Sequence, residues 1–260
     1  MSRNLLQNIA GLYSPSLGPS GYTLLDRSGR GNHGTLQNMT QSDWVGDGNG
    51  WALDVANQTN DAVTYTIPGI SMDAGTVSFW AKKQEAIADV TDYILWSVVT
   101  SATNRLYLEV IINAAAFGTS NPVWHANFGN IASGFCFFEG VTTNIWYHVA
   151  CTWAVGRPME IYVNGRRGTP TTANYTAQSA TTERIGNYST LSVSWGGLID
   201  DFGRWSRALS HAEINTIYNM SRGGLGRLAI QGPPRHAYKA AGVKTYLFVN
   251  RNSIIGGGTI

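Results

Sequence analysis

The stretch Asp26-Arg-Ser-Gly-Arg-Gly-Asn-His-Gly34 carries three glycines whose spacing fits G-x-G-x-x-G, the pattern of dinucleotide-binding turns. Asp54 follows at the distance of the acidic residue of that pattern. In such a turn a buried strand precedes the glycines, and a helix begins within them and meets the pyrophosphate. Here residues 14–21 are turn-forming, and residues 35–40 have poor helix propensity and no apolar period. The stretch therefore predicts a structural glycine-rich turn and argues against a nucleotide site.

The composition is typical of a single large β-sandwich. Only 13% of the 260 residues are charged, whereas about a quarter is usual in a soluble domain. Thirty glycines, nine tryptophans and twelve tyrosines accompany many small polar residues. A chain of this length can bury one large core, and all-β domains of this size are common.

Short apolar runs with rough alternation recur between turn signals. They cover residues 51–56, 62–67, 76–83, 93–99, 105–112, 123–128, 135–139, 146–153, 160–163, 183–186 and 197–205. Strands at this spacing, with almost no helical period between them, indicate an all-β fold of two antiparallel sheets. Asn164 and Gly165 follow one strand and form the preferred two-residue hairpin turn, because both tolerate positive φ.

One short helix is predicted near the end of the folded part. Ser210 and Glu213 form a capping box at its start. Ile214, Ile217 and Tyr218 then share one face, and glycines follow the last turn. We expect this single helix to pack on the sandwich.

The two cysteines, Cys136 and Cys151, are too few for a disulfide framework. They lie in strands 135–139 and 146–153, which we expect to pair as a hairpin without placing the thiols opposite each other. Both are predicted to be buried free thiols.

The charge distribution separates a body from a tail. The last acidic residue is Glu213, and six cationic residues follow it. We therefore expect a folded domain at residues 1–224 and a basic extended tail at 225–260 that contacts an assembly, with a solvated tail as the alternative. The predicted contact residues are Arg235, Tyr238, Lys239, Lys244, Tyr246, Phe248 and Arg251.

The sequence lacks two features that would direct a protein to a membrane or out of the cell. The chain has no apolar run of about eighteen residues, so no membrane span is expected. Residues 1–12 lack the apolar centre of a secretory signal. We expect a protein made in the cytoplasm that leaves the cell only with a particle or by lysis.

Four segments together resemble the laminin-G-like jelly roll of the concanavalin A-like lectin/glucanase superfamily. They are residues 26–34, the strand at 76–81, residues 146–153 with the hairpin at 162–165, and residues 197–205 leading into 207–214. Their order and spacing match the family over residues 12–220. The resemblance implies a jelly roll of two curved sheets, and it implies no single function, since the fold hosts lectins, hydrolases and structural modules.

The resemblance also suggests that the protein holds a structural calcium ion. Members of the family often hold one, and the matching acids are Asp26 and one of Asp200 or Asp201. The loop adds the Asn32 amide and flexible carbonyl groups, which suit a hard cation. The alternative is that Asp26 only braces its own turn through backbone N–H groups.

Catalytic patterns are missing from the sequence. The family's glucanases place two carboxyl groups on one strand face, roughly 5–5.5 Å apart for retaining chemistry, and no Glu-x-Asp-x-x-Glu strand occurs. Asp200 and Asp201 are adjacent and should point to opposite faces of a strand. The five histidines have no metal-ligand spacing. We expect no enzyme.

A carbohydrate ligand would need exposed aromatic faces beside amide groups. The candidates from polar surroundings are Trp124, Tyr175, Tyr188 and Trp195. The tryptophans in predicted strands are expected in the core, namely Trp51, Trp80, Trp146, Trp153 and Trp205.

The last thirty residues resemble tails that follow such domains in bacteriophage proteins. They contain Arg235-His-Ala-Tyr238, Tyr246, Arg251 and Gly256-Gly-Gly258. The leading hypothesis is therefore a non-enzymatic, homo-oligomeric decoration protein of a phage capsid, located in the virion and anchored through its tail to capsid or other virion proteins. The alternative hypothesis is a carbohydrate-binding module that recognises cell-surface glycans.

Overall fold

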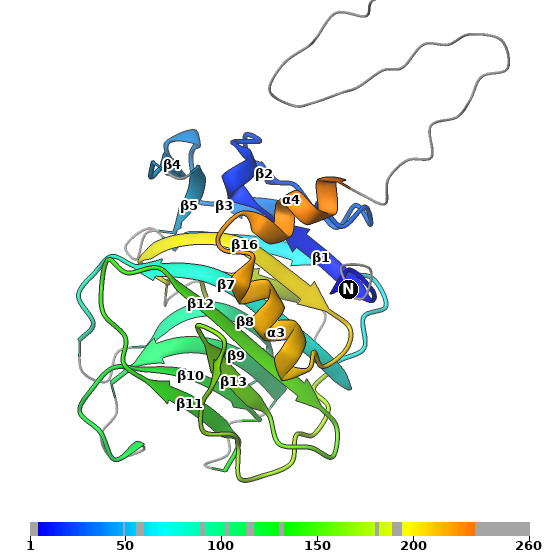
Figure 1. Ribbon diagram of the computed structural model, residues 1–260, viewed down its shortest axis with the longest axis vertical. Helices are drawn as coiled ribbons and strands as arrows, with labels where there is room; N and C mark the ends of the chain where they lie inside the picture. Colours follow the sequence, from blue (N-terminus) through cyan, green and yellow to red (C-terminus); the bar gives the residue numbers. More distant parts are fainter. Residues whose placement is uncertain are drawn as a thin grey trace, which may run out of the picture. The chain divides into compact units, whose positions relative to one another are not determined.

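Two antiparallel β-sheets, packed face to face, form most of the described chain (Figure 1). The computed structural model describes residues 5–48, 50–55, 60–88, 92–101, 104–112, 117–129, 133–179, 182–188 and 194–231. Each sheet has eight strands within these residues. The all-β, two-sheet antiparallel prediction is confirmed, and the strands are consistent with a jelly-roll sandwich.

The first sheet has the order β14-β13-β12-β7-β16-β5-β4, and β1 also pairs with β16. Its strands are β1 (Ile9–Tyr13), β4 (Trp44–Gly46), β5 (Trp51–Val55), β7 (Ala74–Lys83), β12 (Tyr147–Ala154), β13 (Glu160–Val163), β14 (Arg166–Arg167) and β16 (Gly197–Trp205). The predicted turn at Asn164 and Gly165 joins β13 to β14, with φ angles of 48° and 75°.

The second sheet has the order β11-β10-β9-β8-β15-β6-β3-β2. Its strands are β2 (Thr23–Leu24), β3 (Gly34–Gln37), β6 (Ala62–Thr66), β8 (Tyr93–Ser101), β9 (Asn104–Ile111), β10 (Val123–Phe128), β11 (Phe135–Glu139) and β15 (Thr182–Ile185). Short 3₁₀ turns lie at Pro15–Leu17 (η1) and Gln41–Asp43 (η2).

The core lies between the sheets and follows the alternation of strand residues. On β7, Val77 and Phe79 face it, while Ser78 between them belongs to the opposite face. The facing sheet contributes Leu106 and Leu108 of β9. Burial of this many large apolar side chains provides the main driving force for folding.

The expected hairpin between residues 135–139 and 146–153 does not form. Strand β11 pairs with β10 in the second sheet, whereas β12 pairs with β7 and β13 in the first. Cys136 and Cys151 are buried free thiols, as predicted. They meet across the sandwich, where burial and the neighbouring thiol raise the pKa of Cys136 well above its ordinary value.

Two helices cover the outer face of the first sheet, where the sequence predicts one (Figure 1). Helix α3 (His211–Asn219) has the expected capping box of Ser210 and Glu213, and it buries Ile214 and Ile217. Helix α4 (Gly224–Gln231) lies where the basic tail was expected to begin, and its Leu225 is 1% exposed. The chain divides at the last residue of this helix, into Met1–Ile230 and Gln231–Ile260.

Strand β16 contains a bulge where its partner on one edge changes from β5 to β1. The bulge lies at Asp200 and Asp201, and Asp201 has a φ of 44°. Because the strand is locally non-extended, both carboxylates contact residues 14–16. The expectation that these neighbours point to opposite faces is therefore wrong: the bulge interrupts the two-residue period.

Candidate functional site

A groove of about 700 Å³ lies where the glycine-rich turn meets β1 and the segment that follows β6. Its volume is within the range of small-molecule sites. Polar side chains line it from four separate segments: Asn8, Arg30, Asn32, Ser71 and Ser206. Apolar side chains supply the remainder of the lining, namely Ile9, Ala10, Ile67, Pro68 and Ile70.

Asp26 organises the turn that forms one wall of the groove. Its Oδ1 accepts from the backbone N–H of Leu12 (3.0 Å) and of Ser28 (2.8 Å). Its Oδ2 accepts from the Ser28 hydroxyl (2.8 Å) and the backbone N–H of Asn32 (3.0 Å). Gly29 and Gly31 have φ angles of 84° and 77°, which other residues rarely adopt. The glycines therefore shape a turn that is braced by a carboxylate.

The same turn is fastened to β1. The Tyr13 hydroxyl donates to the carbonyl of Asn32 (2.5 Å), and the Asn32 Nδ2 donates to the carbonyl of Ala10 (2.9 Å). Arg30 donates through Nε to the carbonyl of Ile9. Burial and then the Asp26 charge raise the pKa of Tyr13, so its hydroxyl remains a donor. The wall is held by residues that also line the groove.

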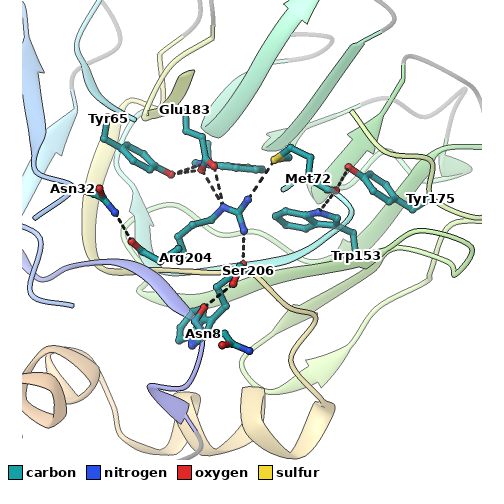
Figure 2. Close-up of polar contacts among 12 residues, drawn as sticks. Asn8, Asn32, Tyr65, Met72, Trp153, Tyr175, Glu183, Arg204 and Ser206 are labelled. Carbon is teal, nitrogen blue, oxygen red and sulfur yellow. Dashed lines mark hydrogen bonds and ion pairs between the residues drawn. The ribbon is translucent and has the colours of Figure 1, made fainter. Parts of the chain in front are cut away.

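The opposite wall, residues 67–71, is held through Met72. The carbonyl of Met72 accepts from Trp153 Nε1 (3.2 Å) and from the Tyr175 hydroxyl (2.9 Å). Figure 2 shows both rings directed at Met72, with Arg204 on its other side. Arg204 Nη2 lies 3.4 Å from the Met72 sulfur. The groove is thus built on the sandwich core and needs little reordering to accept a ligand.

Behind this wall lies an ion pair in the core of the sandwich (Figure 2). Arg204 Nε is 3.1 Å from Oε1 of Glu183, and the two side chains are 0% and 1% exposed. The Tyr65 hydroxyl (2.5 Å) and Trp96 Nε1 (3.1 Å) also donate to Glu183. Burial, followed by the Glu183 charge, raises the pKa of Tyr65 well above its ordinary value. Every contact in this cluster is structural.

Accessible polar groups on the groove lining are not engaged by other described residues. Among the described residues, the side-chain amide of Asn8, the Oδ1 of Asn32 and the terminal nitrogens of Arg30 have no hydrogen-bond partner. The Ser206 hydroxyl donates to the Asn8 carbonyl at 3.3 Å. Donors and acceptors beside an apolar surface are the groups that orient a polar ligand.

Three of the four predicted ligand-binding aromatics are wrong. Trp124, Tyr175 and Trp195 are 0% exposed and belong to the core cluster between the sheets. Trp124 stacks on Trp195 with ring centroids 5.6 Å apart. Trp124 is at an inward-facing position of β10, and Tyr175 and Trp195 lie in segments outside the strands that also pack into the core. The polar sequence neighbours of these residues give no sign of that burial. Tyr175 contributes indirectly, through the bond to Met72.

The expected core tryptophans divide into two groups. Trp153 and Trp205 are buried as predicted. Trp51 is 40% exposed at the start of β5, and Trp80 and Trp146 are half-buried. Their strands are present, but these positions lie outside the space that both sheets enclose.

Tyr188, the fourth predicted aromatic, is half-buried beside the second sheet. Its hydroxyl accepts from Arg105 Nη1 at 3.1 Å. Nearby, His125 Nδ1 lies 2.6 Å from Oε1 of buried Glu109, and Phe117 packs on the imidazole. Glu109 Oε2 and His125 Nε2 have no partner in the described part of the chain. Burial raises the pKa of Glu109, against the lowering effect of His125.

Sequence reasoning overlooked this Glu109–His125 pair, although a signal exists. Each polar residue interrupts an apolar run at an out-of-phase position, on β9 and β10 respectively. Their register places them directly opposite each other. No described hydroxyl or thiol bonds to His125 Nε2, so the pair lacks a nucleophile there.

The predicted calcium ligands fall into two places. Asp26 and Asn32 belong to the glycine-rich turn, where N–H and O–H donors surround the carboxylate. Asp200 bonds Arg222 (3.1 Å), and Asp201 accepts from the N–H groups of Leu225 (3.2 Å) and Gly226 (3.3 Å). These donors take the positions a cation would need. Within the described ranges no three acidic, histidine or cysteine side chains are grouped to hold a metal ion.

The carboxylates of β16 have shifted pKa values. Burial, with the Asp201 charge as second cause, raises the pKa of Asp200 to about 7, although Arg222 opposes the shift. Burial also raises the pKa of Asp201. Calcium stays a prediction from the resemblance.

The predicted partner-binding residues between Arg235 and Arg251 lie outside the described residues. Among the helices that are described, none is long and apolar enough to cross a membrane.

Comparisons with known proteins agree with this architecture. A structure of botulinum neurotoxin type C, a toxin whose cell entry is described as dependent upon interaction with two ganglioside molecules, aligns with a TM-score of 0.61 and 15% identity, covering 84% of this chain and 52% of that one. This chain thus spans about half of the neurotoxin chain. Domain 4 of the arabinanase AbnA from Geobacillus stearothermophilus, solved with arabinotriose, aligns with a TM-score of 0.57 and 14% identity over 81% of this chain and 98% of that domain.

A further similar structure is the Trypanosoma rangeli sialidase, with a TM-score of 0.58 and 14% identity over 82% of this chain and 33% of that one. At such identities the likeness shows the fold alone. No curated protein sequence matches the chain. The profile of the concanavalin A-like lectin/glucanases superfamily, laminin-G type, matches residues 37–215. The match covers more than half of the sequence, and the chain therefore belongs to the concanavalin A-like lectin/glucanases superfamily.

Proposed function

We propose that the chain is a non-catalytic glycan-binding module whose ligand lies in the groove beside the glycine-rich turn. The observation that carries this proposal is the convergence on one groove of accessible polar groups of Asn8, Arg30 and Asn32 that no described residue engages. Both walls are fastened to the core, so binding orders few side chains and loses little entropy.

The chemistry of the lining suits a sugar. Amide and guanidinium groups exchange hydrogen bonds with ring hydroxyls, and the accessible apolar surface of Pro68 and Ile70 suits the C–H face of a pyranose. The arabinotriose complex of the similar AbnA domain and the ganglioside dependence stated for the similar neurotoxin support this class of ligand.

A glycan array followed by calorimetry tests the proposal. The parent protein binds at least one oligosaccharide, and Asn8→Gly with Ser206→Ala weakens that binding by about tenfold or more, since each change removes a hydrogen-bonding group. Glycine keeps the φ of 59° that Asn8 adopts. Tyr188→Phe, beside the second sheet, is the matched control and keeps full affinity. Binding to no glycan, or equal binding by the double variant, contradicts the proposal.

We propose as a second function that the C-terminal segment attaches the module to a phage particle, in homo-oligomeric contact with capsid or other virion proteins. The supporting observation is the charge pattern, in which residues 232–260 contain four cationic residues, Arg235, Lys239, Lys244 and Arg251, and no acidic residue. Deleting residues 232–260 keeps helix α4 and the packed unit. The truncated protein then keeps its melting temperature and no longer co-sediments with virions. Undiminished co-sedimentation refutes the attachment role and leaves the glycan proposal standing.

A further inference from the structure

We infer that the groove takes an acidic saccharide, whose carboxylate or sulfate group lies between Arg30 and Arg27. The inference rests on the proposed glycan-binding function and names the charge of its ligand. It depends on a second hollow, on the fixed orientation of Arg30, and on the distribution of charge around both hollows.

The second hollow adjoins the groove. It measures about 350 Å³ and shares Ile9 and Arg30 with the groove. Arg27, Ser28 and Gly29 complete the side formed by the glycine-rich turn. Arg30 therefore borders both spaces, and Arg27 borders the smaller one.

Arg30 is oriented before any ligand binds. Its Nε donates to the carbonyl of Ile9, which fixes the plane of the guanidinium. The two terminal nitrogens have no partner among the described residues. A guanidinium with a free pair of parallel N–H donors matches the two oxygens of a carboxylate or sulfate.

The charges around the hollows are unbalanced. No aspartate or glutamate lines either space, and neither Arg27 nor Arg30 forms an ion pair in the described part of the chain. Asp26 is the nearest acid in sequence, and four N–H and O–H donors of the turn and of Leu12 engage its carboxylate, which is not directed at either guanidinium as an ion pair. An anionic ligand group would be a direct ion-pair partner for the two arginines.

The groove would bind the sugar ring of the ligand, and the smaller hollow would bind its anionic group. The larger groove carries the amide and hydroxyl groups, and the smaller hollow carries the second arginine. A free inorganic anion would contact only the arginines. An acidic saccharide contacts both spaces, so it should bind more tightly than either sulfate or a neutral sugar.

The experiment compares oligogalacturonate with its methyl ester, which has the same sugar and no charge. A sulfated dextran oligosaccharide and its unsulfated parent form the second pair, with inorganic sulfate alone as the simple anion. Calorimetry uses the full chain, Arg30→Gln, Arg27→Gln and the control Arg157→Gln, an exposed arginine remote from the turn in sequence.

The parent protein and Arg157→Gln should prefer the charged member of at least one pair by about tenfold or more, the worth of a charge-assisted hydrogen bond. Arg30→Gln should abolish that preference and Arg27→Gln should reduce it. Equal binding of both members of both pairs, a preference that survives Arg30→Gln, or sulfate competing as well as the saccharide overturns the inference. Binding of neutral glycans only also overturns it and leaves the proposed function intact, whereas binding of no glycan at all refutes the function itself.

Discussion

Arg204 and Glu183 form an ion pair that water does not reach. Desolvation of two charges is costly, and the pair is tolerated because several partners engage both ions. Glu183 accepts from Tyr65 and Trp96, while the guanidinium lies 4.8 Å from the ring of Trp153. The pair joins β15 of one sheet to β16 of the other, and the groove wall at Met72 depends on it.

Arg204→Met should lower the free energy of unfolding by about 3–5 kcal/mol, because it leaves Glu183 buried without its counter-charge. Urea denaturation at neutral pH measures the loss. Replacing both ions, as Arg204→Met with Glu183→Leu, should recover a large part of it. A decrease in the free energy of unfolding of less than about 1 kcal/mol in the single variant would show that the ion pair does not stabilise the groove wall at residues 67–71.

Position 75 accommodates only glycine, because neighbouring side chains occupy the space that a Cβ atom would need. A Cβ there would lie 2.3 Å from the Trp153 ring and 2.5 Å from Nη1 of Arg204. Gly75→Ala should cost about 1–3 kcal/mol through overpacking. Gly46→Ala is the matched control, since nothing lies within 4 Å of its Cβ position and its φ is not positive. Equal melting temperatures for the two variants would contradict the packing described.

At the scale of elements, the bulge of β16 connects three parts of the chain. Asp201 accepts from the first N–H groups of helix α4, and Asp200 bonds Ser16 and Arg222. A carboxylate at a helix N-terminus stabilises the helix through unpaired N–H groups and the helix dipole. Helix α4 begins Gly-Leu-Gly, a poor helix-forming start, and it depends on this contact.

The pKa of Asp200 gives the stability a defined pH dependence. The folded state holds this proton up to about pH 7, whereas an exposed aspartate loses it near pH 3.8. Unfolding therefore releases a proton between these values, and stability falls as the pH rises through that window. The loss relative to Asp200→Asn should be on the order of a few kcal/mol, since each unit corresponds to about 1.36 kcal/mol.

Urea titrations of both proteins at intervals from pH 4 to pH 8 measure this difference. The groups facing Asp200 are Asp201, Arg222 and the Ser16 N–H, and the variant keeps all three. The difference in stability should decline up to about pH 7 and then level. A difference that rises with pH would contradict the raised pKa.

Helix α3 depends on its capping box. Ser210→Ala should cost about 0.5–2 kcal/mol, because the N–H of Glu213 loses its acceptor. Thr216→Ala, on the exposed side of the same helix, should change stability by less than about 0.5 kcal/mol. Thermal melts compare the two. If both variants melt alike, the cap does not stabilise the helix.

The strands were largely predictable, and the reasons lie in individual segments. The run at 93–99 is almost continuously apolar and forms β8, and the run at 123–128 places Trp124, Ala126 and Phe128 on one face and forms β10. Strand β1 was missed because Ile-Ala-Gly-Leu-Tyr is short and contains glycine, and its partner β16 is far away in the sequence. Local pattern predicts a strand but does not determine its partner, which is also why the hairpin at 135–153 is wrong.

At the scale of the whole molecule, the groove could not be read from any one motif. Its residues come from positions 8–10, 30–32, 67–71 and 206, which only the fold brings together. The glycine-rich turn was recognised as structural, and its alternative interpretation as a carboxylate-braced turn matches the geometry. Arg30 is a candidate because the fold places it on the lining of the groove, which no pattern in its sequence neighbourhood indicates.

Nuclear magnetic resonance with oligogalacturonate tests the central claim most directly, because it locates the ligand on the protein. Saturable shifts are predicted for the side-chain amides of Asn8 and Asn32 and for the Nε–H of Arg30. The signals of Tyr188 and His125, beside the second sheet, should stay in place. Saturable binding that moves Tyr188 and His125 and leaves Asn8, Arg30 and Asn32 unchanged would contradict the account.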